Sequence, residues 1–194
     1  EGYYIDYGGQ FEAQQESSRL ILVLSIFSLL AIFIVLFAHF RSTGIALQVM
    51  LNIPLALVGS VIAVAITGGT FSVATMVGFI TLTGIASRNG IMMISHYIHL
   101  IKYEGEKFSK EMIIRGALER LVPVMMTALV AALALIPLSL NGQASGKEIL
   151  HPVAVVILGG LISSTFLALI VTPVVFYLYG EKALNKYLKE TATD

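Results

Sequence analysis

Residues 81–96, Thr-Leu-Thr-Gly-Ile-Ala-Ser-Arg-Asn-Gly-Ile-Met-Met-Ile-Ser-His, place Arg88 within an apolar run that extends over about residues 71–101. A run of this length crosses a lipid bilayer. A charged side chain at that depth is costly, so Arg88 is a functional-site hypothesis by default and requires a partner. All twelve Asp and Glu residues lie outside the apolar runs. The expected carboxylate partner is therefore not in this sequence.

The composition is that of a polytopic membrane protein. Hydrophobic residues make up 57% of the chain and charged residues 12%, whereas soluble domains carry about a quarter charged residues. The net charge is zero and no basic patch is present, which argues against a nucleic-acid partner. There is no cysteine, hence no thiolate metal site. Nucleophilic triads, phosphate loops and paired carboxylates are also absent, so we expect neither an enzyme nor a cofactor.

Five apolar segments predict an all-α integral membrane protein, because each is near the ~20 residues that a bilayer core requires. They cover about residues 20–40, 44–67, 71–101, 121–140 and 152–179. The polar residues 10–19 contain no helix breaker and are predicted to continue into the first segment as one helix. Residues 2–7 are rich in β-forming side chains and precede Gly8-Gly9, a pattern typical of a strand end and a turn.

The positions of lysine and arginine predict the orientation, because short cytoplasmic loops collect these residues. Of the twelve lysines and arginines, nine follow the first, third and fifth segments and only Arg19 and Lys147 lie on the opposite side. The twelfth is Arg88, within the third segment. We therefore expect the N-terminus outside and the C-terminus inside. In residues 102–120, apolar side chains recur at roughly helical spacing and charged side chains lie between them. This pattern predicts a short amphipathic helix on the cytoplasmic surface.

The third segment carries a polar face from the membrane centre to its cytoplasmic end. On a helical period this face contains Thr81, Gly84, Arg88, Met92, Ser95, His96 and His99. Polar faces of this kind line ion or proton paths. An arginine keeps its proton, so Arg88 would act by pairing with ionised carboxylates and releasing protonated ones. The alternative is that Arg88 snorkels to an interface.

Other candidate residues leave two interpretations open. Thr127 lies two helical turns beyond Arg120, and its hydroxyl could bind a carboxylate or water, or bond back to its own helix. His96 and His99, with neighbouring methionines, could form a soft-metal site, but two histidines at a helix end more often face headgroups or water. We predict no metal site. Gly160, Ser164 and Ala168 have the small-xxx-small spacing of close helix packing.

Several stretches together resemble one known family. They are YGGQFEAQ (7–14), LNIPLALVG (51–59), GIASRNGIMMISHY (84–97), RLVPVMMTALVAALALIPLSL (120–140) and HPVAVVILGGLISSTFLALIVTPVVFYL (151–178). The sequence resembles the C-terminal end of inner-membrane permeases of the resistance-nodulation-division (RND) superfamily, in particular their cobalt-zinc-cadmium heavy-metal efflux branch. The resemblance implies the last five of twelve membrane helices over residues 19–180. Residues 1–18 would be the tail of the second periplasmic porter region, and residues 181–194 a cytoplasmic tail.

The resemblance also implies a function, which is proton-driven antiport that exports divalent heavy-metal cations. Arg88 matches a basic residue that faces acidic residues on the family's fourth helix, and Asn89 follows it. Thr127 matches the threonine of the same proton relay, and Arg120 the arginine below it. The implied partners are the rest of the permease, two further copies in a homotrimer, a periplasmic adaptor, an outer-membrane channel and the bilayer.

The sequence departs from the family in two respects. Copper and silver pumps of this branch carry a glutamate at the position of Arg88 and a lysine at that of Val124, so those ions are disfavoured. Family members are also several times longer, which predicts a C-terminal fragment that does not transport alone. Two alternatives remain, namely a permease that exports drugs or other organic molecules, and a truncated membrane protein without transport activity.

Overall fold

The computed structural model describes residues 9–69, 71–140 and 149–191, and these ranges form α-helices without any strand. The helices are α1 (Gln10–Phe40), α2 (Thr43–Met50), α3 (Asn52–Ile66), α4 (Val73–Tyr103), α5 (Lys110–Leu140) and α6 (Leu150–Thr191). Counted over these ranges, with α2 and α3 taken as one span, five helices are long and apolar enough to cross a membrane. The strand expected at residues 2–7 lies outside the described residues.

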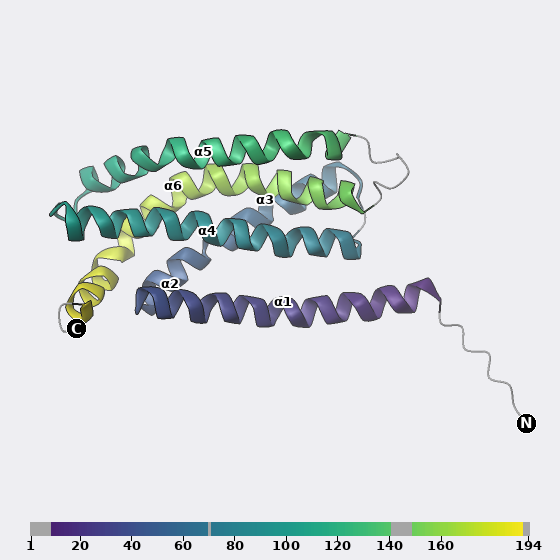
Figure 1. Cartoon of the computed structure of the whole chain (residues 1–194), viewed down its shortest axis with the longest axis horizontal. Coiled ribbons are helices and arrows are strands. Elements are labelled where there is room, and N and C mark those ends of the chain that lie inside the picture. Colours follow the sequence, from purple (N-terminus) through teal and green to yellow (C-terminus); the bar gives the residue numbers. More distant parts are fainter. Residues whose placement is uncertain (1–8, 70, 141–148, 192–194) are drawn as a thin grey trace, which may run out of the picture.

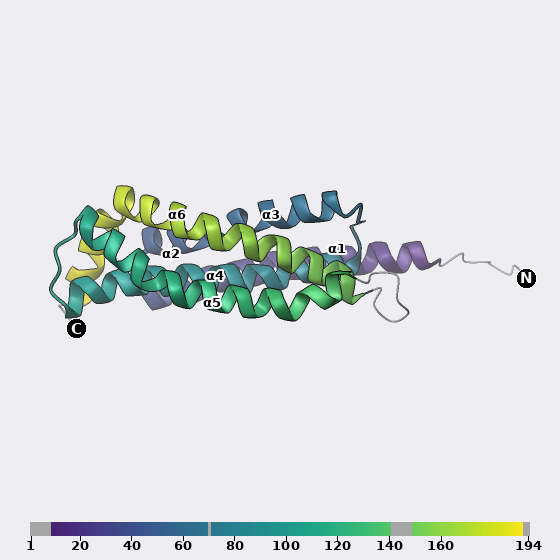
Figure 2. The same cartoon turned by 90° about the horizontal axis from the view of Figure 1, so that it is seen from above.

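The helices run back and forth along one axis (Figure 1). The end of α1, the α4–α5 connection and the last turns of α6 lie at one end of this bundle, on the left of Figure 1. Helix α6 packs against α2, α3, α4 and α5, and is therefore the centre of the bundle. Helix α1 contacts mainly α2 and α4, and its N-terminal turns extend beyond the other helices (Figure 2).

Helix α1 includes the polar residues 10–19, as the absence of a breaker predicted. It ends at Phe40 and is capped by Arg41, which has a left-handed backbone (φ 46°) and whose N–H bonds the carbonyl of Phe37. Most apolar side chains of α1 are exposed within this chain, for example Phe27 and Ile34 at more than 60%. Such a surface is compatible with lipid or with further protein, but not with water.

The second apolar segment is interrupted, whereas a single helix over 44–67 was predicted. Helix α2 ends at Met50 and α3 begins at Asn52. Pro54 lacks the N–H that would bond the carbonyl of Met50, and its ring crowds that carbonyl. The buried Asn52 fills the break, since its Nδ2 donates to the carbonyl of Val49 (3.2 Å) and its Oδ1 accepts from Thr172 Oγ1 of α6 (2.9 Å). The break is thereby tied to the central helix.

Residues 102–120 do not form the separate amphipathic helix that was expected. Helix α4 continues to Tyr103, and residues 110–120 are the first turns of α5, continuous with the fourth apolar segment. Their apolar side chains divide between the bundle and its surface, since Ile114 and Leu118 are exposed. Met112 and Ile113 are buried in the same cluster as Tyr97 and Phe176, which satisfies the apolar face within the protein.

Helix α6 continues past residue 179 to Thr191, so part of the predicted tail 181–194 is helical. Its predicted packing residues Gly160, Ser164 and Ala168 are all buried. A Cβ on Gly160 would collide with Leu82 of α4 and Ser60 of α3, so the absence of a side chain permits three helices to meet there.

Candidate functional site

A cavity of about 460 Å³ between α4 and α5 brings together three of the four residues predicted to form a relay. Arg88 and Asn89 come from α4 and Thr127 from α5. The rest of the lining is apolar: Ile85, Met126, Ala128, Val130, Ala131, Ala134 and Leu161. The cavity is therefore a small group of polar side chains within hydrocarbon, an arrangement in which a charge has a large effect.

Arg88 is the middle residue of α4, since fifteen residues separate it from each end of the helix. This spacing corresponds to about 22 Å of helix on either side. Its side chain is exposed within this chain and makes no hydrogen bond or ion pair with any residue in the described ranges. The guanidinium has five N–H donors to satisfy, so this side of α4 is open to a partner that the described residues do not supply.

The position of Arg88 around the axis of α4 is fixed two residues later, at Gly90. A Cβ on Gly90 would lie 2.6 Å from Asn52 Nδ2 and 3.1 Å from the carbonyl oxygen of Val49. Helix α4 is thus packed directly against the break between α2 and α3, and only glycine fits this contact. Asn89, 7% exposed, is buried beside it. The backbone that presents Arg88 is consequently held by the rest of the bundle.

Thr127 adopts the back-bonded arrangement that was one of its two interpretations. Its Oγ1 donates to the carbonyl of Val124 at 3.0 Å. This bond uses the hydroxyl proton and leaves the oxygen lone pairs available to accept a further bond. Thr127 can therefore accept a hydrogen bond from a proton-bearing group in the cavity, although its own proton is engaged.

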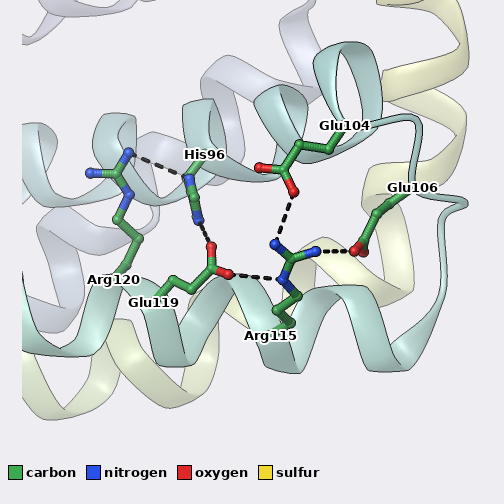
Figure 3. A network of polar contacts seen from close by, with 6 residues as sticks. All are labelled: His96, Glu104, Glu106, Arg115, Glu119 and Arg120. Atoms are coloured by element: carbon green, nitrogen blue, oxygen red, sulfur yellow. Dashed lines mark hydrogen bonds and ion pairs between the residues drawn. The ribbon is translucent and has the colours of Figure 1, made fainter.

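Arg120 does not line this cavity but belongs to a polar cluster at the α4–α5 end of the bundle (Figure 3). A terminal guanidinium nitrogen lies 3.5 Å from Nδ1 of His96, while Nε of Arg120 is buried without a partner in the described part of the chain. Nε2 of the same ring lies 2.7 Å from Oε2 of Glu119. His96 thus faces two charged side chains of α5, where headgroups or water had been expected.

Arg115 joins the cluster through three carboxylates. Its guanidinium bonds Glu119 (2.8 Å), Glu104 (2.9 Å) and Glu106 (Figure 3). The Arg115 side chain is 46% exposed, so solvent screens these ion pairs and each contributes little to stability. Glu119 precedes the apolar residues 121–140, and the bond from His96, then that from Arg115, holds the pKa of its carboxyl below the ordinary value.

Sequence reasoning missed Glu119 and Arg115 as members of a site. One signal was present, because the two residues have the i, i+4 spacing of a helical ion pair. Nothing in the sequence indicated that this pair would meet His96. As for metals, no group of three or more His, Cys, Asp or Glu residues in the described ranges could hold an ion.

Comparison with known proteins gives one consistent result. Residues 1–180 match the model of the AcrB/AcrD/AcrF family. Protein HelA of Legionella pneumophila is 42% identical over 178 residues, and the cobalt-zinc-cadmium resistance protein CzcA of Cupriavidus metallidurans is 40% identical over 181. These alignments cover 92% and 93% of this chain and 17% of each relative. The multidrug resistance protein MdtC of Escherichia coli is 31% identical over 190 residues, or 97% of this chain and 18% of MdtC.

A solved structure gives the same answer. The crystal structure of a heavy metal efflux pump matches with a TM-score of 0.79 and 38% identity, over 89% of this chain and 17% of the pump. The chain thus spans about one sixth of the length of the relatives that it matches. The family and the five apolar helices identify a multi-pass protein of the inner membrane. The chain belongs to the AcrB/AcrD/AcrF family, and within these RND permeases to the heavy-metal efflux branch.

Proposed function

We propose that this chain is part of a proton-driven antiporter that exports divalent heavy-metal cations across the cell envelope. The observation that carries the proposal is the cavity in which Arg88, Asn89 and Thr127 meet, with Arg88 lacking a carboxylate among the described residues. The names of similar proteins refer to cobalt, zinc, cadmium and nickel. Arg88 is a cation in apolar surroundings without a partner in the described residues. It can therefore supply one half of a charge switch, a pair whose other half, a carboxylate, gains and loses a proton.

The switch would work by changing the charge of the missing partner. Ionised carboxylates from the family's fourth helix would pair with Arg88, whose own charge is permanent. Protonation of those carboxylates removes their charge and so releases Arg88. Asn89 would accept or donate hydrogen bonds at the same place and Thr127 would accept them, and so ease the change between the two states. Because Gly90 packs against Asn52 and Val49, a movement of α4 would be transmitted to α2, α3 and α6.

The surrounding assembly is also a proposal. The five spans within residues 19–180 would be the last five of a twelve-helix permease that forms a homotrimer. This permease would be the inner-membrane component of a tripartite system with a periplasmic adaptor and an outer-membrane channel. Residues 1–18 would belong to the second periplasmic porter region. The N-terminus would be periplasmic, and the α4–α5 connection and residues 181–194 cytoplasmic, as the lysines and arginines predict.

The main alternative is an RND permease that exports drugs or other organic molecules. Its support is the similarity to MdtC, whose name refers to multidrug resistance. MdtC proteins are 31% to 36% identical to this chain, whereas CzcA is 40% identical, which favours a metal. A truncated membrane protein without transport is the third possibility. It requires that the coding sequence upstream of Glu1 is not in frame.

The test replaces Arg88 in the full-length permease, expressed in a metal-sensitive host. Arg88→Ala should abolish tolerance of cobalt, zinc and cadmium at unchanged expression, because the carboxylates lose their counter-charge. Arg88→Lys is the matched control, since it keeps the charge but not the guanidinium geometry, and should retain part of the tolerance. Unchanged metal tolerance of Arg88→Ala would refute the role of Arg88. Protection against organic toxins without metal tolerance in the wild type would favour the alternative.

A further inference from the structure

His96 lies where α4 meets α5, between two side chains of opposite charge (Figure 3). Its Nε2 is 2.7 Å from Glu119 Oε2, and its Nδ1 is 3.5 Å from a terminal nitrogen of Arg120. The ring is only 12% exposed. Both partners belong to α5, so the histidine connects the two helices that also enclose the cavity of Arg88.

One placement of the ring proton satisfies both contacts. A guanidinium group has only N–H donors and no acceptor, so Nδ1 must accept the hydrogen bond from Arg120. The ring proton is then on Nε2, where it is donated to the carboxylate of Glu119. The bond at one nitrogen thus sets the state of the other. In this arrangement His96 is neutral and Glu119 fixes its tautomer.

The position of Arg120 depends in turn on this ring. The bond to His96 is the hydrogen bond that the structure gives the Arg120 guanidinium, and Nε of Arg120 is buried without a partner in the described ranges. A single acceptor therefore holds a permanently charged side chain near the α4–α5 end of the helices. Any change that removes this acceptor leaves Arg120 free to turn elsewhere.

We propose that His96 is a positioning residue, which holds Arg120 when its ring is neutral and releases Arg120 when its ring is protonated. This proposal rests on the function proposed above. A proton taken from water by the Nδ1 lone pair makes the ring cationic and leaves it no acceptor. Nδ1–H then faces the N–H groups of Arg120, so the hydrogen bond is lost and the two cations repel. Nε2–H remains bonded to Glu119 as an ion pair. Loss of the proton to water restores the original contact.

The charge around the ring comes mainly from α5. Glu119 and Arg120 contact His96 directly, and Arg115 acts through Glu119. Helices α2 and α3 carry no ionisable side chain. Further ionisable side chains at this end of the bundle are His39, Arg41, Tyr97, His99, Lys102, Tyr103, Glu104, Glu106, Lys107, Lys110, Glu111, Tyr177, Tyr179 and Glu181, whereas the side chains that bond His96 are Glu119 and Arg120. Of these, His39, His99 and Lys102 line a separate cavity between α1 and α4.

The first test measures metal transport by the full-length permease in proteoliposomes. The internal and the external pH are changed together, so that the pH difference across the membrane stays constant. Histidine changes charge between pH 5 and 8, so the wild-type rate should change several-fold across this range. In His96→Gln the amide can donate to Glu119 and accept from Arg120 at every pH, and the rate should vary less than about twofold.

Two further variants make this test specific. His99→Gln removes a histidine one turn away that touches neither Glu119 nor Arg120, and should keep the wild-type profile. Glu119→Gln removes the counter-charge of the protonated ring, and should move the acidic arm of the profile to lower pH. A His96→Gln profile that matches the wild type would overturn the proposal. So would a His99→Gln profile as flat as that of His96→Gln.

The second test does not require transport. Selectively ¹⁵N-labelled histidine and arginine in the full-length permease are observed by NMR in nanodiscs, with His96 assigned by its loss in His96→Gln. Neutral His96 should carry its proton on Nε2, and Arg120 signals should shift as the ring protonates. A proton on Nδ1, or Arg120 signals that do not respond, would overturn the proposal. Absence of proton-coupled metal flux in the wild type would instead contradict the proposed function and leave this readout intact.

Discussion

Gly90→Ala is the substitution that most directly tests how the bundle positions Arg88. The new Cβ would lie 2.6 Å from Asn52 Nδ2, 3.1 Å from Val49 Cγ1 and 3.1 Å from the carbonyl oxygen of Val49. Ordinary contacts of a Cβ begin near 3.4 Å, so α4 must retreat or Asn52 must turn. Neither is easy, because Asn52 is bonded to both Val49 and Thr172.

The magnitude follows from two opposing effects. Overpacking of a tight contact costs about 1–3 kcal/mol, whereas alanine in place of glycine within a helix gains roughly 0.5–1 kcal/mol. We expect Gly90→Ala to be destabilising by about 1–2 kcal/mol in net. Gly84 provides the matched control, because nothing lies within 4 Å of its Cβ position. Gly84→Ala should be stabilising by roughly 0.5–1 kcal/mol.

The assay is SDS-induced unfolding of the 194-residue chain in dodecylmaltoside micelles, followed by circular dichroism at 222 nm. The unfolding midpoints of the two variants should move in opposite directions from the wild type. Equal shifts of Gly90→Ala and Gly84→Ala would refute the close approach of α4 to the α2–α3 break. They would also remove the proposed route by which Arg88 moves the bundle.

Three further outcomes are expected. Thr172→Val removes the donor to Asn52 Oδ1 and leaves that buried oxygen unpaired, so the SDS midpoint should indicate a loss of about 1–3 kcal/mol, whereas an unchanged midpoint would contradict the bond. The lowered pKa of Glu119 means that its ion pairs stabilise the fold above the ordinary carboxyl pKa and are lost as pH falls through the lowered value. Amide hydrogen exchange of residues 104–109, corrected for intrinsic rates, should therefore be slower at pH 7 than at pH 3, and equal protection would argue against the network. The 194 residues alone, reconstituted in liposomes, should show no proton-coupled metal flux, because the acidic partner is missing, and such a flux would contradict that reasoning.

The apolar spans could be predicted from sequence because the bilayer imposes a local rule. A span must be apolar over its length and must satisfy its own backbone, which composition and length reveal without tertiary information. The same reasoning located Arg88, since a charge in an apolar run is visible in the sequence itself. The continuous helix over residues 10–40 followed from the absence of glycine and proline.

The errors concern features that depend on how the helices pack. Pro54 was visible, but membrane helices often tolerate proline, and the break is stabilised by a bond from Thr172, 120 residues away. Residues 110–120 have an amphipathic pattern that fits a membrane surface as well as a protein core, and only packing against Tyr97 decides between these. The pairing of His96 with Glu119 requires the relative rotation of α4 and α5. A single sequence does not contain that rotation.

The central claim is that Arg88 couples proton movement to metal export. It is tested most directly by the full-length permease in proteoliposomes that contain a metal-sensitive dye and a pH-sensitive dye. In the wild type, an imposed pH difference should drive metal flux, and a metal gradient should drive proton flux. In Arg88→Ala both coupled fluxes should disappear while zinc still binds the purified protein. Coupled fluxes of wild-type size in Arg88→Ala would contradict the account.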